Sequence, residues 1–265
     1  MSYLNLNPIS RDTGYKVVDI ATPASQLTCW EAGQGHDDIV RCAIEDNLTY
    51  IPVRNEGRIT GIISRKALEA GETPCNLTSD WLIATDTTIL EIIELFAEQP
   101  DRVFLVLKAS NIVGLVAPAD LNKIPARASV YLLIAHFEAE LARLIRRILP
   151  ADEDYQPFLT ADRWQKLQTE KANAAQKDIE LDLLHHMHIY DLALIARQND
   201  QVRELLGFET ASKARRALDF QSWRNRVSHP TRPLITSRAE LVKLNEACHR
   251  LIDLNQRITQ ASRQL

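Results

Sequence analysis

The sequence has few cysteines and lacks any long run of apolar residues, and each lack excludes a class of protein. Its four cysteines, Cys29, Cys42, Cys75 and Cys248, stand far apart and form no CxxC pair. They therefore indicate free thiols in a reducing cytoplasm rather than a disulfide framework. The most apolar segment, residues 131–149, is interrupted by charged side chains. It cannot supply the roughly 20 apolar residues that a membrane-spanning helix needs.

The N-terminus also lacks the marks of a targeting signal. Residues 1–8 have neither a basic start nor an apolar core, so we expect no signal peptide, no membrane contact and a cytoplasmic protein. The content of 45% hydrophobic and 25% charged residues is average for a soluble globular protein. A chain of 265 residues is long enough for two domains that each bury a core.

The charge is divided unevenly along the chain. Residues 1–126 hold 10 Lys and Arg against 17 Asp and Glu, whereas residues 127–265 hold 21 against 18. The first part is therefore acidic and the second slightly basic, so a polyanion would bind the second part. Charge alone fits an ordinary solvated helical surface equally well.

A gap-free internal repeat lies in the acidic half. Residues 50–68 align with residues 103–121 at an offset of 53. Each copy has two apolar runs joined by a turn, followed by a short helical segment and preceded by an amphipathic helix, at 37–46 and at 88–98. Asp86 is expected to cap the second of these helices. Each copy is thus predicted to fold as strand–helix–strand–strand–helix with a central hairpin.

This repeat resembles the CBS motif, and two copies in tandem resemble a Bateman module covering residues 8–125. The repeats would span about residues 15–70 and 78–124. In that family a cleft between the copies often binds an adenosine-containing ligand. The ligand is contacted by a Ser or Thr that stands three residues before an Asp, because a hydroxyl can meet a phosphate and a carboxylate can accept from ribose.

Each copy keeps half of that ligand pattern. The first has Ser64 but carries Ala67 where the Asp is expected, and the second has Asp120 but carries Ala117 where the hydroxyl is expected. The resemblance thus implies an adenine nucleotide as a regulatory ligand, contacted by Ser64 and Asp120. A structural or dimerising module without a nucleotide is the open alternative.

Beyond Pro125 the strand signals stop and helical patterns take over. The predicted helices cover about residues 127–149, 162–175, 179–198, 201–206, 211–229 and 238–262. Five or six helices without strands predict an α-bundle for residues 126–265. The fold class is therefore α+β, with a short linker at 120–125 that should couple the two domains mechanically.

The most specific feature of the chain is an R-N-x-x-x-H string formed by Arg224, Asn225 and His229 near the end of a predicted helix. Pro230 disfavours helical geometry at His229, so the imidazole should stand at the helix end. Arg224 falls inside the apolar stripe of the same helix. A guanidinium there is costly unless an anion compensates it, either a carboxylate of the bundle or a phosphate guest.

The string and its helical surroundings resemble the HEPN-domain ribonucleases over residues 127–262. The resemblance implies a homodimer with a composite site, because one helix spreads Arg224 and His229 widely. The RNA 2′-hydroxyl would attack its neighbouring phosphate, giving a cyclic phosphate and a 5′-hydroxyl. Arg224 would stabilise the transition state and His229 would transfer protons, while Asn225 orients either group. Neither a metal nor another cofactor is required, and toxins and antiviral-defence enzymes use this chemistry.

Two further groups of side chains could have either a functional role or an ordinary surface or packing role. Basic residues near the string could hold flanking RNA phosphates, although a solvated surface charge is the commoner role for each taken singly: Lys213, Arg215, Arg216, Arg226, Arg232 and Arg238. A group of potential metal ligands comprises His185, His186, His188, Asp182 and Asp191. No Cys or distant His completes a recognisable ligand set, so we expect no metal site.

Two other functions stay open on the sequence. The protein could be a non-catalytic nucleotide sensor whose helical domain binds RNA or a partner protein. Alternatively, the helical domain could be the partner or antidote of a separate nucleotidyltransferase, as some HEPN domains are.

Overall fold

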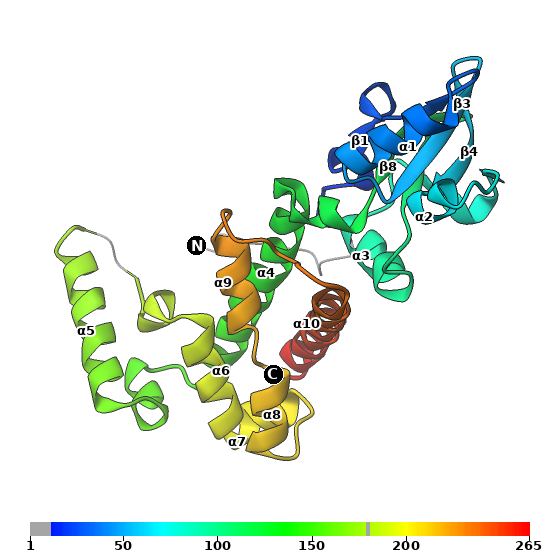
Figure 1. Cartoon of the computed structure of the whole chain (residues 1–265). Coiled ribbons are helices and arrows are strands. Elements are labelled where there is room, and N and C mark those ends of the chain that lie inside the picture. Colours follow the sequence, from blue (N-terminus) through cyan, green and yellow to red (C-terminus); the bar gives the residue numbers. More distant parts are fainter. Residues whose placement is uncertain (1–11, 179–180) are drawn as a thin grey trace. The chain divides into compact units, whose positions relative to one another are not determined.

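The computed structural model of the chain describes residues 12–178 and 181–265. The chain divides into two compact units, one formed by Gly14–Ala126 and the other holding Arg127–Leu265 (Figure 1). Among the described residues, no helix combines the length and apolar character needed to cross a membrane.

The first unit contains two four-stranded sheets with matching strand orders, β2-β3-β4-β5 and β1-β8-β7-β6. The strands of the first sheet are β2 (Trp30–Glu31), β3 (Tyr50–Asn55), β4 (Arg58–Ser64) and β5 (Cys75–Asn76). Those of the second are β1 (Thr22–Pro23), β6 (Leu82–Ala84), β7 (Phe104–Lys108) and β8 (Asn111–Val116). In each sheet a parallel pair, β2 with β3 or β6 with β7, adjoins an antiparallel hairpin.

The predicted repeat pattern is confirmed by the order of the elements. Helix α1 (His36–Glu45) lies between β2 and β3, and α3 (Ile89–Glu98) lies between β6 and β7. The hairpin of the first copy leads into α2 (Arg65–Glu69), whereas that of the second leads into a 3-10 turn, Pro118–Asn122. The first unit is therefore built from two CBS-like sheet–helix repeats.

The aligned glycines Gly61 and Gly114 have a common structural cause. Each lies opposite a valine of its hairpin and against the backbone of a further strand. A Cβ atom on Gly61 would lie 2.9 Å from the carbonyl oxygen of Cys75, and one on Gly114 would lie 2.7 Å from that of Thr22. Both separations are too short for a real Cβ, so the close approach of the outer strand requires glycine in each copy.

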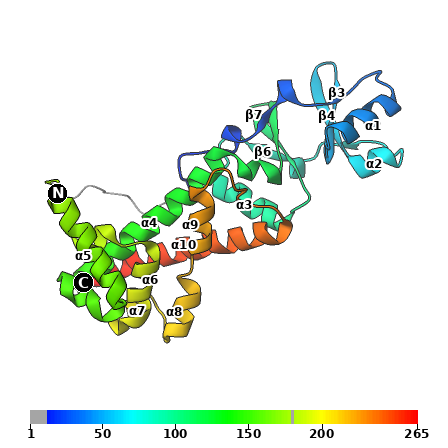
Figure 2. The same cartoon turned by 60° about the vertical axis from the view of Figure 1, so that its left-hand side comes forward.

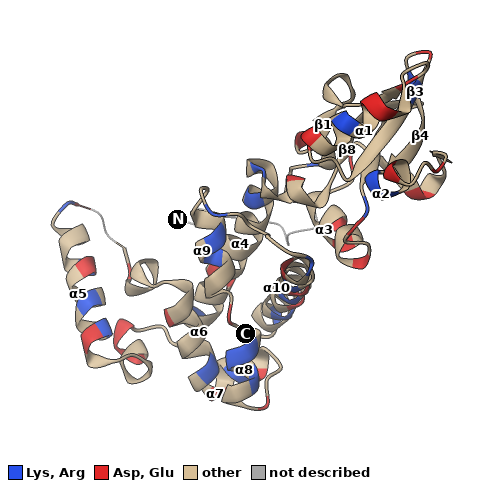
Figure 3. Cartoon of the chain, viewed as in Figure 1, with Lys and Arg blue, Asp and Glu red and all other residues tan. Residues whose placement is uncertain are grey.

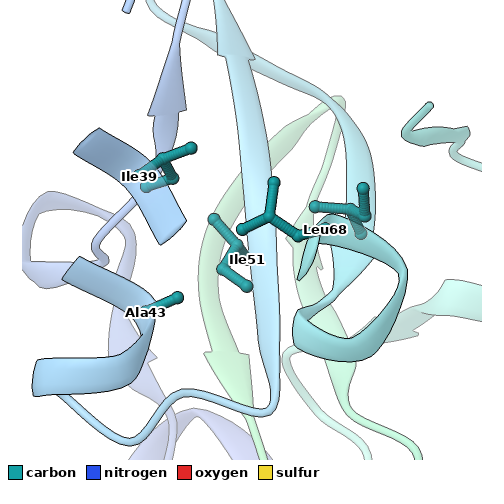
Figure 4. Packing of buried hydrophobic residues seen from close by; sticks show 5 residues of the cluster. Ile39, Ala43, Ile51 and Leu68 are labelled. Carbon is teal, nitrogen blue, oxygen red and sulfur yellow. The ribbon is translucent and has the colours of Figure 1, made fainter. Parts of the chain in front are cut away.

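Each copy packs its helices on its sheet through apolar side chains. Figure 4 shows the cluster of the first copy, in which Ile39 and Ala43 of α1 face Ile51 of β3 and Leu68 of α2. All four are fully buried. The alternation of buried and exposed residues along α1 follows the helical period from which the amphipathic helix was predicted.

Over residues 127–178 and 181–265 the second unit is built from helices joined by turns and loops, without a strand, as predicted. Its helices are α4 (Ile124–Ile148), α5 (Ala161–Ala175), α6 (Ile189–Gln198), α7 (Asp200–Leu205), α8 (Ala211–Ala217), α9 (Gln221–Ser228) and α10 (Arg238–Gln264). The longest two, α4 and α10, are prominent in Figure 2. A hydrogen bond of 2.6 Å from Arg147 to the carbonyl oxygen of Ser262 joins their C-terminal ends.

Two of the predicted helices were wrong in their extent. The helix expected over 211–229 is broken, because α8 ends at Ala217 and α9 begins at Gln221. Phe220 at the break is 1% exposed and packs edge-on against Phe137, with the ring centres 5.4 Å apart. Burial of this ring in the core favours the turn over a continuous helix.

The helix expected over 179–198 is also shorter than predicted. Residues 179–180 lie outside the described residues, and a 3-10 turn, Leu183–His186, precedes α6. The carboxylate of Asp191 accepts a hydrogen bond of 2.9 Å from the backbone of His188. This contact is typical of a helix N-terminus, so it fixes the start of α6 at Ile189.

The predicted N-cap at Asp86 was wrong as well. Thr88 caps α3, and its hydroxyl accepts a hydrogen bond of 3.2 Å from the backbone of Glu91. The Glu91 carboxylate in turn accepts one of 2.7 Å from the backbone of Thr88. This reciprocal pair satisfies two free N–H groups at once, which a single aspartate cannot do.

Candidate functional site

Helix α9 positions the R-N-x-x-x-H residues. Trp223 and Val227 are buried on the core side, Arg224 is half-buried, and Asn225 and His229 are exposed. His229 lies directly after the helix, with φ −113° and ψ 89°, as Pro230 predicts. The helix therefore presents an exposed imidazole at its end and a partly covered guanidinium one turn earlier.

The charge of the Arg224 guanidinium acts on a carboxylate of the bundle, that of Glu138 on α4. Burial raises the pKa of the Glu138 carboxyl, while the charges of Arg224 and His188 and a hydrogen bond from the backbone of Ile189 oppose that rise. The fold thus brings a carboxylate, one of the two anions that the sequence left open, within electrostatic range of Arg224. Glu138 is a site residue that the R-N-x-x-x-H string could not reveal, because it lies 86 positions earlier.

Asn225 pairs with Gln221 one turn before it. The Gln221 side-chain amide donates to the Asn225 oxygen at 3.3 Å. The Gln221 amide oxygen is buried and has no hydrogen-bond partner in the part of the chain that the structure describes. The structure thus places Asn225 within a short polar row along the exposed side of α9.

The segment after α9, residues 229–237, is called the His229 loop below. It is held by Arg127 of α4, which is 4% exposed. The Arg127 guanidinium donates hydrogen bonds to the carbonyl oxygens of His229 and Arg232, both at 2.7 Å, and to that of Arg226. Burial lowers the pKa of Arg127. A buried cation thereby fixes the main chain that carries His229.

A second contact holds the far end of the His229 loop. The Arg226 guanidinium donates to the Glu240 carboxylate at 2.6 Å and to the carbonyl oxygen of Leu234 at 3.1 Å. Glu240 also accepts from the backbone and the hydroxyl of Thr236, at 2.8 and 2.7 Å. Hydrogen bonds from Arg226 and Thr236 lower the pKa of the Glu240 carboxyl to about 2. Arg226, predicted to contact RNA, is therefore engaged in this internal pair.

The other predicted RNA contacts lie at separate places. Lys213 of α8 pairs with Glu209, and Arg232 is exposed in the His229 loop. Arg216 and Arg226 line one cavity of about 400 Å³ together with Lys243 and Arg250. The Lys and Arg positions of α8, α9 and α10 are coloured blue in Figure 3.

Three of the five potential metal ligands, Asp182, His185 and Asp191, make structural side-chain contacts. Asp191 is 3% exposed and accepts two hydrogen bonds from Arg163, at 3.0 and 2.7 Å. Asp182 pairs with Arg146 and with the ring of His185. Within the described residues, no group of three or more His, Cys, Asp or Glu side chains could hold a metal ion.

The two predicted nucleotide contacts of the first unit cap helical turns. The Ser64 hydroxyl accepts a hydrogen bond of 3.2 Å from the backbone of Ala67. The Asp120 carboxylate accepts one of 2.7 Å from the backbone of Ala117 and pairs with Lys123 at 2.8 Å. A cavity of about 500 Å³ in this unit is lined by both hairpin turns and by neither of these residues.

Comparison with known proteins gives matches among solved structures alone, since no family model and no curated protein matches the chain. CBSX2 in complex with AMP, a protein of Arabidopsis thaliana, is 20% identical over 41% of this chain and 93% of its own, with a TM-score of 0.37. The CBS domain of a bacterial CNNM/CorC family Mg²⁺ transporter in complex with ATP is 17% identical over 40% and 83%, with a TM-score of 0.35. A CBS domain protein from Shewanella oneidensis MR-1 is 21% identical over 40% and 92%, with a TM-score of 0.33. The HEPN resemblance of the helical unit stays a prediction.

Proposed function

We propose that the helical unit is a metal-independent endoribonuclease of the HEPN type. The observation that carries the proposal is the end of α9, where exposed His229 follows half-buried Arg224 and the intervening backbone is fixed by buried Arg127. A fixed main chain beside a proton-transferring group and a cation suits phosphoryl transfer, which depends on positioning and charge stabilisation.

In the proposed reaction the 2′-oxygen of a ribose forms a bond to the adjacent phosphorus, and the bond from phosphorus to the 5′-oxygen breaks. One His229 imidazole removes the 2′-hydroxyl proton, and a second, from another copy of the chain, protonates the leaving oxygen. Arg224 donates to the phosphoryl oxygens as negative charge accumulates, and Asn225 orients the phosphate. Glu138 acts as a positioning residue for Arg224. The products are a cyclic phosphate and a 5′-hydroxyl.

We further propose that an adenine nucleotide bound by the first unit regulates this cleavage, and that the protein belongs to the toxin or antiviral-defence type. The gap-free repeat supports a sensor module, and AMP and ATP are bound by two of the proteins compared above. The ligand contacts proposed are Ser64 and Asp120. Ser64→Ala and Asp120→Asn should each reduce the rise in melting temperature caused by AMP or ATP. The absence of any rise in the wild-type protein would contradict the sensor.

The ribonuclease is tested by incubating the purified chain with single-stranded RNA in EDTA. Wild-type protein should give fragments with cyclic phosphate ends, and Arg224→Ala or His229→Ala should abolish them. Arg263→Ala and His249→Ala, which alter the same residue types on α10, serve as matched controls and should cleave normally. Equal cleavage of a fully 2′-deoxy substrate would exclude attack by the 2′-hydroxyl.

A non-catalytic RNA-binding function is the second candidate, and the Glu138 carboxylate near Arg224 favours it. A guanidinium that interacts with a carboxylate inside the protein can serve packing and binding without chemistry. If the Arg224 and His229 variants bind RNA more weakly while wild-type protein never cuts it, this second function is correct.

A further inference from the structure

A cavity of about 430 Å³ lies within the helical unit among α6, α8 and the start of α9. Its lining comprises Ile189, Tyr190, Ala193, Leu194, Arg197, Arg215, Leu218, Asp219, Phe220 and Gln221. The volume lies within the range of small-molecule sites. The lining contains none of Arg224, Asn225 and His229, and of the predicted basic contacts it contains Arg215.

The chemistry of the lining suits a planar, hydrogen-bonding ring. Tyr190 is 58% exposed, so its ring is available for stacking rather than used in the core. Leu194 and Leu218 add apolar wall, and Arg197 and Arg215 add guanidinium groups that can stack on a ring or pair with a phosphate. Proteins recognise unstacked RNA bases with this combination of aromatic face, guanidinium and polar side chain.

Two contacts join this cavity to the proposed reacting groups. Gln221, one of the lining residues, donates to Asn225 at 3.3 Å, and its buried amide oxygen has no partner among the described residues. Ile189, also in the lining, donates its backbone N–H to the carboxylate of Glu138, on which the Arg224 charge acts. One lining residue thus contacts Asn225, and another contacts Glu138, on which the Arg224 charge acts.

We propose that this cavity binds one nucleobase of single-stranded RNA adjacent to the phosphate held at Arg224, with Tyr190 stacking on the base. The inference rests on the proposed function, because the RNA substrate comes from it. The substrate would be RNA that is single-stranded and unpaired at that base, since a base in a duplex is already stacked on its neighbours. A free mononucleotide shares the same ring chemistry, and the test separates the two sources.

The test measures binding in the His229→Ala background, so that no cleavage is needed. The probe is a fluorescent single-stranded RNA of about 12 nucleotides, long enough for one site. Tyr190→Ala should weaken binding roughly tenfold, as loss of one stacked base predicts, and Tyr190→Phe should retain it. Tyr15→Ala, which alters a tyrosine that is 38% exposed in the first unit, is the matched control. Arg215→Gln tests the guanidinium independently.

A scan of the probe with single abasic nucleotides then locates the base. At the position of the bound base, an abasic nucleotide should weaken binding by the wild-type protein, and Tyr190→Ala should then cause no further loss. At every other position, the loss from the abasic nucleotide and the loss from Tyr190→Ala should add. Equal losses at every position, or unchanged binding by Tyr190→Ala, would overturn the inference. Competition by AMP or UMP that matches the RNA in affinity would also overturn it in favour of a free nucleotide.

If Tyr190-dependent binding is found but wild-type protein never cuts RNA, the base site stands and the ribonuclease fails. If RNA is cut but Tyr190→Ala binds RNA as tightly as the wild type, the ribonuclease stands and the base site fails.

Discussion

Arg127 gives the sharpest test of how the helical unit is held together. Replacing it with methionine keeps most of the apolar stem but removes the guanidinium that binds three carbonyl oxygens, those of Arg226, His229 and Arg232. A hydrogen bond from a charged donor contributes about 1.5–3 kcal/mol. Two effects make the net loss smaller than the sum of the three bonds: the freed carbonyls of the exposed His229 loop can reach water, and the buried cation is itself costly to desolvate. We therefore expect the free energy of unfolding to fall by about 3 kcal/mol.

The loss is measured by urea unfolding and by amide hydrogen exchange over residues 229–237. Arg127→Met should lower the free energy of unfolding of the helical unit and speed exchange in the His229 loop, and Arg127→Lys should recover part of both. Arg147→Met is the matched control on the same helix, because Arg147 is exposed and donates to one carbonyl oxygen, that of Ser262. It should cost about 0.5 kcal/mol or less.

Arg127 does not hold the His229 loop if Arg127→Met lowers the free energy of unfolding by less than about 1 kcal/mol and leaves hydrogen exchange in the loop at the wild-type rate. That result would mean that the loop is held by the Arg226–Glu240 contacts alone. A large loss of stability with an unchanged loop would instead assign Arg127 to general packing.

Two further predictions concern ionisation. Hydrogen bonds from Arg226 and Thr236 lower the pKa of the Glu240 carboxyl to about 2. The contribution of Glu240 to stability is therefore complete above the unfolded pKa of about 4.3 and is lost as the pH falls towards 2. Glu240→Gln should remove this acid dependence and cost about 1–2 kcal/mol at neutral pH, and an unchanged acid limb in urea titrations would contradict it. Burial raises the pKa of the Cys248 thiol to about 12, so a thiol reagent at pH 8 should label exposed Cys75 quickly and leave Cys248 protected until the protein unfolds. Rapid labelling of Cys248 in native protein would show that α10 opens.

The first unit could be predicted from its sequence because the features that define it are local and repeated. The 53-residue offset places the hairpins, and the helical period places the buried face of α1. Even the aligned glycines carried a readable signal, although their cause became visible with the outer strands beside Gly61 and Gly114. The cap at Thr88 was missed because Asp86 was considered alone, without the Glu91 that completes the reciprocal pair.

The helical unit was predictable in class but not in its contacts. Arg127 gives no local sign of its role, since its partners are backbone carbonyls 99 to 105 positions away. Glu138 and the lining of the 430 Å³ cavity come from helices whose packing no single-helix pattern encodes. The break at Phe220 was missed because residues 211–229 have an acceptable helical pattern, and the core contact with Phe137 overrides it.

The neighbouring arginines of α9 show how the fold separates roles that the sequence leaves equivalent. Arg226 is bound directly to Glu240 and Leu234, so its charge is committed to the His229 loop. Arg224 acts on Glu138 through its charge and remains half-buried at the exposed polar row. Arg226→Met should therefore lower the melting temperature and disturb RNA binding only as the loop loosens. Arg224→Met should leave the melting temperature close to that of the wild type and weaken RNA binding and cleavage directly. The opposite pattern would mean that the phosphate lies at Arg226 and that Arg224 is structural.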